Sequence, residues 1–104
     1  MKDEDLEINE TIDGDLCRFT AKGRVDSNSA DIMETNLDRA LNEGPKNIIL
    51  NMEQVKYLSS IGIRIILKTY KKAYENGGTF LIEKPSQIVR NVLGMVAINQ
   101  MLIK

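Results

Sequence analysis

The chain has 104 residues, 42% hydrophobic and 28% charged, a composition typical of one globular domain. Fourteen basic and fifteen acidic residues leave a formal charge of −1, which gives no electrostatic reason to bind nucleic acid or an anionic membrane. The sequence contains no histidine, so catalytic triads built on histidine are excluded and the commonest zinc ligand is missing. It also lacks the glycine-rich phosphate-binding motifs. We therefore expect no catalytic site, no metal and no cofactor.

The cellular location is predicted from what the sequence lacks. A single cysteine, Cys17, excludes an intramolecular disulfide framework, and its place in a strand favours a small buried hydrophobic residue over a reactive thiol. No apolar run approaches the roughly 20 residues of a membrane span. The acidic start, Met1-Lys2-Asp3-Glu4-Asp5, differs from a signal peptide. We expect a cytoplasmic protein whose residues 1–104 form a single domain.

The N-terminal half predicts a hairpin followed by a helix. Residues 5–10 alternate polar and apolar, an Asp-Gly turn follows, and residues 16–21 alternate again, which indicates two antiparallel strands. We expect the second strand to break at Gly23 and a helix to run over residues 30–41, ended by Gly44-Pro45. Hydrophobic residues at helical spacing predict its buried face: Ala30, Met33, Leu37, Ala40 and Leu41.

The C-terminal half predicts two further strand–helix units. Residues 48–50 form a short apolar run, typical of a strand covered on both faces, and a polar connection leads to a helix over residues 60–74. Residues 79–82 predict a strand, Pro85-Ser86 opens a third helix, and residues 100–103 suit a last short strand. The apolar stripe predicted for the second helix is Ile63, Ile66, Leu67, Tyr70 and Tyr74. Three lysines of that helix are expected to face water: Lys68, Lys71 and Lys72.

The order of these elements predicts an α/β fold. Strands that alternate with helices imply parallel pairing through right-handed crossovers. We expect a small mixed β-sheet, in which an N-terminal antiparallel hairpin joins parallel βαβ units and about three helices pack on the sheet.

Two serines, Ser59 and Ser60, fall where a buried strand passes into the second helix. The first backbone N–H groups of a helix are unpaired and its dipole is positive there. A hydroxyl at this place can serve as a cap, as part of an anion site, or as an exposed target for modification. Ser59 favours the cap, which leaves Ser60 at the first helical position.

Four stretches of the chain resemble the STAS domain, shared by bacterial anti-sigma factor antagonists and the cytoplasmic tails of sulfate transporters. The main one runs from Ile49 to Ile63 (ILNMEQVKYLSSIGI), with its serine pair before a helix. The others are Gly23-Arg24-Val25-Asp26 before the first helix, Asn76-Gly77-Gly78 before a strand, and Ile88 to Met95 in the third helix. The resemblance covers the chain from Leu6 onward and implies the STAS fold.

The resemblance also implies a function. Ser60 falls on the serine that antagonists of this family have phosphorylated, with Ser59 as the second candidate. Three residues depart from the family pattern: Ser59 replaces an Asp, Ile61 a Ser and Arg64 a small Gly. The implied function is binding of an anti-sigma factor of the serine kinase type, ended by phosphate on Ser60 and restored by a phosphatase. The residues implied for partner binding are Asp26, Ser27, Ser59, Ser60, Gly62, Ile63 and Arg64.

Several alternatives remain open at this point. The same loops could bind a nucleotide, a small molecule or another anion at the helix start, or the chain could be a subunit of a larger signalling assembly of STAS domains. An enzyme with Ser60 as nucleophile lacks a histidine base, and Lys56 is a poor substitute, so we expect a non-enzymatic protein. We expect it to be a monomer or weak homodimer.

Individual site residues also have two interpretations. Asp26 is either a turn or cap residue or a contact to the partner or a nucleotide. Arg64 is expected on a solvated helix face, within reach of a phosphate on Ser60. Gly62 is expected to leave the start of the helix open beside the serines.

Overall fold

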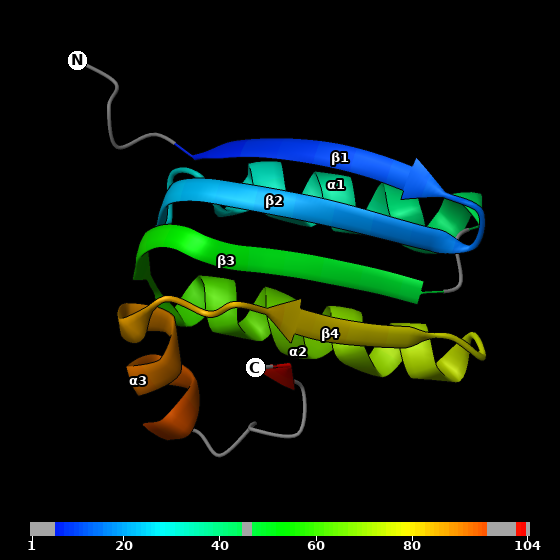
Figure 1. Ribbon diagram of the computed structural model, residues 1–104. Helices are drawn as coiled ribbons and strands as arrows, with labels where there is room; N and C mark the ends of the chain where they lie inside the picture. The colour runs from blue at the N-terminus through cyan, green and yellow to red at the C-terminus, as the bar shows by residue number, and fades with distance from the viewer. Residues whose placement is uncertain (1–5, 45–46, 96–101, 104) are drawn as a thin grey trace.

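The computed structural model describes residues 6–44, 47–95 and 102–103, and these residues form one mixed sheet with three helices (Figure 1). The strands follow the order β1-β2-β3-β4-β5, with β1 antiparallel to β2 and every other neighbouring pair parallel. The predicted α/β fold, its hairpin and its βαβ units are confirmed. The elements are β1 (Glu7–Asp13), β2 (Leu16–Val25), α1 (Ala30–Glu43), β3 (Asn47–Leu58), α2 (Ser60–Glu75), β4 (Thr79–Glu83), α3 (Gln87–Met95) and β5 (Leu102–Ile103).

Helices α1 and α2 lie side by side on one face of the sheet, behind it in Figure 1, and both begin at the edge where β2 and β3 end. Helix α3 lies beside that edge and is attached to β3, because Ser86 N donates to Met52 O at 3.2 Å and Ser86 Oγ donates to Val55 O at 2.7 Å. The face of the sheet turned to the viewer carries no helix from the described residues.

The hydrophobic core lies between the sheet and α1 and α2. The predicted alternation of β2 is confirmed, because Cys17, Phe19 and Ala21 are buried while Leu16 on the other face is only half-buried. Ile49 of β3 is also half-buried, so the expectation that this strand is covered on both faces is wrong. The largest fully buried side chains include Phe19, Phe80, Met33, Leu37, Ile48, Leu50, Met52, Ile66, Ile82 and Leu93.

Strands β2 and β3 are both longer than predicted. β2 continues through Gly23, where a break was expected, and β3 continues to Leu58 through what was expected to be a polar connection. The pairing shifts register between Thr20 and Lys22 and again between Gly23 and Arg24, and Gly23 adopts a φ of 116° that favours glycine. Each shift inserts an extra residue into β3, so the alternation of buried and exposed residues is lost in β3 after Met52, whereas β2 keeps alternating to Val25.

The buried face of α2 is rotated relative to the predicted stripe. Leu67 and Tyr74 are 39% and 49% exposed, and Ile63 and Tyr70 are half-buried. Small residues let the helix lie close to the sheet, and the Thr69 hydroxyl is satisfied by Ile65 O at 2.8 Å. The buried residues of α2 are Gly62, Ile65, Ile66, Thr69 and Ala73.

The remaining predicted elements are found with small changes at their ends. β1 runs on to Asp13, and the hairpin turn has Gly14 at a φ of 62°. Helix α1 ends at Glu43 before Gly44, and the last strand is limited to Leu102–Ile103 within the described residues. Part of the predicted strand over 100–103 lies outside the described residues.

Candidate functional site

The junction between β3 and α2 is held by backbone and cap hydrogen bonds. Ser59 N donates to Val25 O at 2.9 Å, which joins the end of β3 to the end of β2. Ser59 Oγ accepts from Gly62 N at 3.4 Å, and Ser59 O accepts from Ile63 N at 3.0 Å. Ser59 is thus the N-cap of α2, as predicted, a role that stabilises a helix by about 1 kcal/mol.

Ser60 is the first residue of α2 and is exposed. Among the described residues, none forms a hydrogen bond with its hydroxyl. The cap is already provided by Ser59, so the Ser60 hydroxyl is not needed to begin the helix. It is therefore open to water and to a modifying enzyme.

Gly62 is buried, and its lack of a side chain is required by close packing. A Cβ at this position would lie 2.6 Å from Leu58 Cδ1 and 2.7 Å from Val25 Cγ1, well inside van der Waals contact. The expectation that Gly62 leaves the helix start open is therefore wrong. Gly62 instead lets the first turn of α2 press against the ends of β2 and β3, which fixes the position of Ser60.

Asp26 organises the turn between β2 and α1. Its Oδ1 accepts from Asn28 N and from Ser29 N, each at 3.0 Å, and Asp26 N donates to Ser29 Oγ at 3.0 Å. Desolvation raises the pKa of Asp26, but these hydrogen bonds and the nearby Arg24 outweigh it and lower the pKa below its usual value. The turn interpretation of Asp26 is confirmed, and Ser27 is exposed in this turn.

Two exposed hydrophobic residues flank the serines. Tyr57 is 40% exposed and Ile61 is 37% exposed. The Arg24 guanidinium carbon lies 4.3 Å from the centre of the Tyr57 ring, a cation–π contact between paired residues of β2 and β3. Neither Tyr57 nor Arg24 was predicted to belong to the site, because the sequence does not reveal the register shifts that pair them.

Helix α2 carries two cations one turn apart with different surroundings. Lys68 was predicted to face water; its side chain is partly exposed, but its Nζ also donates to Glu34 of α1 and lies 3.6 Å from Asp38. The hydrogen bond with Glu34 raises the pKa of Lys68. Arg64 is exposed, as predicted, and forms no hydrogen bond or ion pair with any described residue. Both line a hollow of about 190 Å³ between the helices, together with Asp31, Glu34, Ile61 and Ile65.

The predicted partner-binding residues therefore lie in the turn between β2 and α1 and in the cap and first turns of α2, at one edge of the sheet, at the left in Figure 1. The edge is formed because β2 and β3 are parallel neighbours whose ends are joined by the Ser59–Val25 hydrogen bond. Ile63 is half-buried against the core and Gly62 is buried, so these two shape the edge. We call the surface formed by Ser27, Tyr57, Ser60, Ile61 and Arg64 the serine edge.

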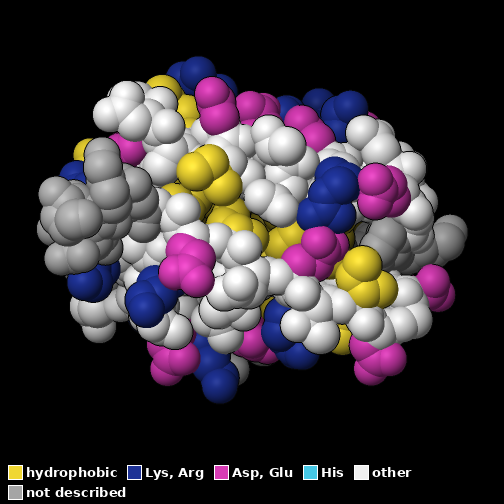
Figure 2. All heavy atoms as spheres, turned by 90° about the horizontal axis from the view of Figure 1, so that it is seen from above, with side chains coloured by type: hydrophobic (Ala, Val, Ile, Leu, Met, Phe, Trp, Pro, Cys, Tyr) yellow, Lys and Arg dark blue, Asp and Glu magenta, His cyan; other side chains and the backbone are white. Residues whose placement is uncertain are grey.

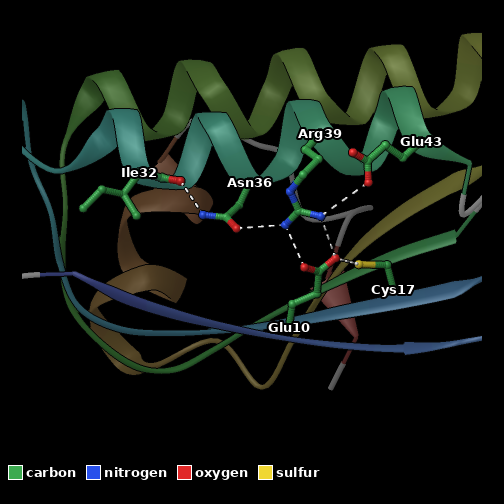
Figure 3. Close-up of polar contacts among 6 residues, drawn as sticks. All are labelled: Glu10, Cys17, Ile32, Asn36, Arg39 and Glu43. Atoms are coloured by element: carbon green, nitrogen blue, oxygen red, sulfur yellow. Dashed lines mark hydrogen bonds and ion pairs between the residues drawn. The ribbon is translucent and has the colours of Figure 1, made fainter.

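A second polar cluster links β1, β2 and α1 (Figure 3). Arg39 Nη2 donates to Glu10 Oε1 at 2.7 Å and to Asn36 Oδ1 at 3.1 Å, and Arg39 Nη1 donates to Glu10 Oε2 at 3.2 Å. Glu43 lies 3.7 Å from Arg39, and the Cys17 thiol donates to Glu10 Oε2 at 3.2 Å. We call these five residues the Glu10 cluster. Each of these side chains forms a hydrogen bond or an ion pair with another residue of the cluster.

The protonation behaviour of the Glu10 cluster indicates a structural role. The hydrogen bond from Arg39 is the main cause that lowers the pKa of Glu10. Burial, with Glu10 nearby, raises the pKa of Cys17 to about 12. A thiol with such a pKa is almost wholly protonated near neutral pH, and only the thiolate is nucleophilic. The interpretation of Cys17 as a buried, unreactive residue agrees with this.

The surface seen from the side of β1 and α1 mixes charges of both signs. Figure 2 shows acidic and basic side chains interspersed around a furrow of hydrophobic side chains, with no broad area of one charge among the described residues of that face. None of the helices in residues 6–44 and 47–95 is long and apolar enough to cross a membrane. The same residues contain no cluster of three side chains that could hold a metal ion.

Comparison with known proteins identifies relatives over nearly the whole chain. The family model described as the STAS domain matches residues 6–103. The anti-sigma factor antagonist SpoIIAA in its unphosphorylated form superposes with a TM-score of 0.83 at 17% identity, covering 93% of this chain and 86% of that one. An anti-sigma factor antagonist from Mycobacterium paratuberculosis gives 0.84 at 16% identity, with 95% and 84% covered. The Bacillus cell fate determinant SpoIIAA in the phosphorylated form gives 0.76 at 16% identity, with 94% and 88% covered.

Proposed function

The chain belongs to the STAS domain family, and from that premise we propose that it is a cytoplasmic anti-sigma factor antagonist rather than an enzyme. In this proposal the unmodified chain binds an anti-sigma factor of the serine kinase type and displaces the sigma factor. Phosphate on Ser60 ends that binding. The observation that carries the proposal is the Ser60 hydroxyl, which is exposed at the first position of α2 and has no hydrogen bond to any described residue.

The serine edge has the composition of a docking surface. Tyr57 and Ile61 supply exposed apolar area, while Ser27, Ser60 and Arg64 supply exposed polar groups. Aromatic residues and arginine are enriched at protein–protein interfaces and often dominate their binding energy. The backbone of the edge is held by the Ser59 cap, the Asp26 turn and the tight contact at Gly62. A partner would therefore meet a surface that is already in place.

The chemistry of the switch needs nothing from this chain except the hydroxyl. The partner kinase transfers the γ-phosphoryl group of ATP to Ser60 Oγ, so a new O–P bond forms, the bond to the β-phosphate oxygen breaks and ADP leaves. The hydroxyl proton passes to a base of the kinase. A phosphatase reverses the modification by hydrolysis.

The modified helix stays folded, because a phosphate at this position lies at the positive end of the α2 dipole. Phosphorylation instead weakens the binding of the partner. A partner surface that fits a neutral hydroxyl offers no counter-charge to the nearly two negative charges of the phosphate, and burying them there costs several kcal/mol. The switch is thus a local change of charge with no need for a change of fold.

Phosphorylation by the partner kinase tests the site directly. We expect labelled ATP and the kinase to label wild type and Ser59→Ala but to leave Ser60→Ala unlabelled. Ser59→Ala is the matched control, because it removes the adjacent hydroxyl and costs about 1 kcal/mol of cap stabilisation without touching the acceptor. Equal labelling of wild type and Ser60→Ala would show that the site is elsewhere.

The docking surface is tested by two substitutions of equal exposure on α2. Ile61 lies on the serine edge and is 37% exposed, while Leu67 lies further along the helix and is 39% exposed. We expect Ile61→Ser to weaken binding of the anti-sigma factor by about tenfold and Leu67→Ser to change it by less than about twofold. If only Leu67→Ser weakened binding, the interface would lie outside the serine edge.

A nucleotide-binding function has weaker support. The hollow lined by Ile61 and Arg64 measures about 190 Å³, below the roughly 300 Å³ at which small-molecule pockets begin. Calorimetry with nucleotides and simple anions, on wild type and Ser60→Ala, separates this function from partner binding. Light scattering separates a monomer or weak homodimer from a subunit of a larger assembly.

A further inference from the structure

The different surroundings of Arg64 and Lys68 in α2 raise a question about Arg64. Lys68 is held by Glu34 and Asp38 of α1, whereas Arg64, one turn earlier, has no partner among the described residues. We propose that Arg64 is the internal partner of a phosphate on Ser60, and that phosphorylation withdraws from the serine edge a guanidinium that the unmodified chain offers to its partner. The inference rests on the proposed function for the modification itself, but the contact can be tested without a kinase.

The geometry of the helix places the two residues together. Ser60 and Arg64 are four positions apart within α2, and side chains at this spacing lie on the same face with Cβ atoms about 5–6 Å apart. An acidic group four residues before a basic one is also the more favourable order in a helix. A guanidinium can donate two parallel hydrogen bonds to phosphate oxygens, which makes arginine well suited to this contact.

The groups around Arg64 leave it available for the phosphate. On α1, Asp31 and Glu34 line the same hollow, but neither forms an ion pair with Arg64, and Glu34 is bound by Lys68. A phosphate brings nearly two negative charges, against one for Asp31. On β2, Arg24 lies over the Tyr57 ring and 3.7 Å from Asp26, so it already has neighbours of its own.

One modification would then have two effects at the serine edge. In the unmodified chain, Arg64 is exposed next to Ser60 and Ile61 and is free to bind a carboxylate of the partner. Phosphate on Ser60 repels that carboxylate and also captures the guanidinium that bound it. The partner surface that fits this arrangement carries an acidic side chain opposite Arg64.

The contact is tested by incorporating phosphoserine at position 60 during synthesis of the full chain and titrating the phosphate by phosphorus NMR at low salt. A nearby cation favours the doubly charged phosphate, so we expect its second pKa to be lower in wild type than in Arg64→Gln, by about half a pH unit. Lys71→Gln, which removes an exposed lysine of the same helix, should leave that pKa unchanged. Arg64→Lys should keep most of the shift, and 1 M salt should reduce it. Equal phosphate pKa values in wild type and Arg64→Gln would overturn the inference.

The second part concerns the partner. We expect Arg64→Gln to weaken binding of the unmodified chain to the anti-sigma factor and to reduce the fold-change that phosphorylation produces. Unchanged affinity of Arg64→Gln would overturn the claim that the guanidinium serves docking. A kinase that fails to modify Ser60 would contradict the proposed function while leaving the NMR titration unaffected, so the two failures are distinguishable.

Discussion

The Glu10 cluster and the serine edge show two different uses of polar side chains in one small domain. In the Glu10 cluster, Arg39 joins Glu10 of β1 to its own helix, and Cys17 donates to the same carboxylate. At the serine edge, the Ser60 hydroxyl and the Arg64 guanidinium are exposed and have no partner among the described residues. The polar groups of the Glu10 cluster bind one another, whereas those of the serine edge are exposed to solvent.

This difference distinguishes polar groups that stabilise the fold from polar groups that are available for binding. Groups that satisfy one another attach α1 to the sheet and need no ligand. Groups left open on a rigid edge add little to stability, and exposed polar residues on positioned loops are typical of binding sites. At the serine edge the rigid part is the backbone, fixed by the Ser59 cap and by the packing of Gly62. The following substitutions test this division, from the largest expected effect on stability to the smallest.

Gly62→Ala should have the largest effect, because the new Cβ would overlap Leu58 Cδ1 and Val25 Cγ1. We expect a loss of about 2 kcal/mol in the free energy of unfolding, measured by urea denaturation. Gly94→Ala is the matched control, since a Cβ there would meet nothing within 4 Å and alanine favours a helix by up to about 1 kcal/mol. If both substitutions stabilised the protein, the tight packing at the start of α2 would be refuted.

Periodicity predicted the order of the strands and helices, and cap chemistry predicted the role of Ser59. For Asp26 the sequence left the turn and the partner contact as alternatives. The full extent of β3 was not predictable, because two extra residues in this strand interrupt the two-residue period. β2 keeps its alternation to Val25, but Gly23 within it wrongly predicted the end of the strand. The burial of Gly62 was missed for a related reason. Hydrophobic patterns weight large side chains, whereas α2 approaches the sheet through its small ones.

The side-chain contacts between helices and strands could not be predicted from the sequence either. Lys68 was expected to be solvated, since nothing in the pattern of α2 shows that Glu34 and Asp38 of α1 lie opposite. In the same way, the Arg24–Tyr57 contact depends on the pairing register of two strands. Contacts of this kind arise only when the elements are packed.

Glu10→Gln should have an intermediate effect that depends on pH. The lowered pKa of Glu10 means that its carboxylate stabilises the fold above its unfolded pKa, near 4.3, and that this contribution is lost as the pH falls through the folded pKa. We expect the variant to lose at most about 1 kcal/mol at pH 7, because the ion pair is partly exposed. Glu83 and Asp26 also have lowered pKa values, so wild type is still destabilised by acid.

The measurement is the difference in unfolding free energy between wild type and Glu10→Gln as a function of pH. The difference should be constant between pH 6 and 8 and should shrink in acid. A difference that grows below pH 4 would contradict the assignment of Glu10 as an ionised partner of Arg39.

The smallest effects should come from substitutions of Lys68 and Arg64 in α2. Lys68→Gln removes the pairs with Glu34 and Asp38, which are more exposed than the Glu10 pair, and should cost about 0.5 kcal/mol at low salt and less in 1 M salt. Arg64→Gln should leave the melting temperature and its salt dependence unchanged, because no described residue pairs with Arg64. Calorimetry at two salt concentrations compares them. A larger loss of melting temperature with Arg64→Gln than with Lys68→Gln would contradict the finding that Lys68, and not Arg64, is paired within the described residues.

The most direct test of the whole account is the affinity of the anti-sigma factor for the chain with serine or phosphoserine at position 60. Both forms can be prepared as full chains, and circular dichroism should show the same fold. Because the partner surface offers no counter-charge to the phosphate and burying that charge costs several kcal/mol, we predict that the phosphorylated form binds at least about a hundredfold more weakly. Equal affinity of the two correctly folded forms would contradict the central claim that Ser60 is the switch.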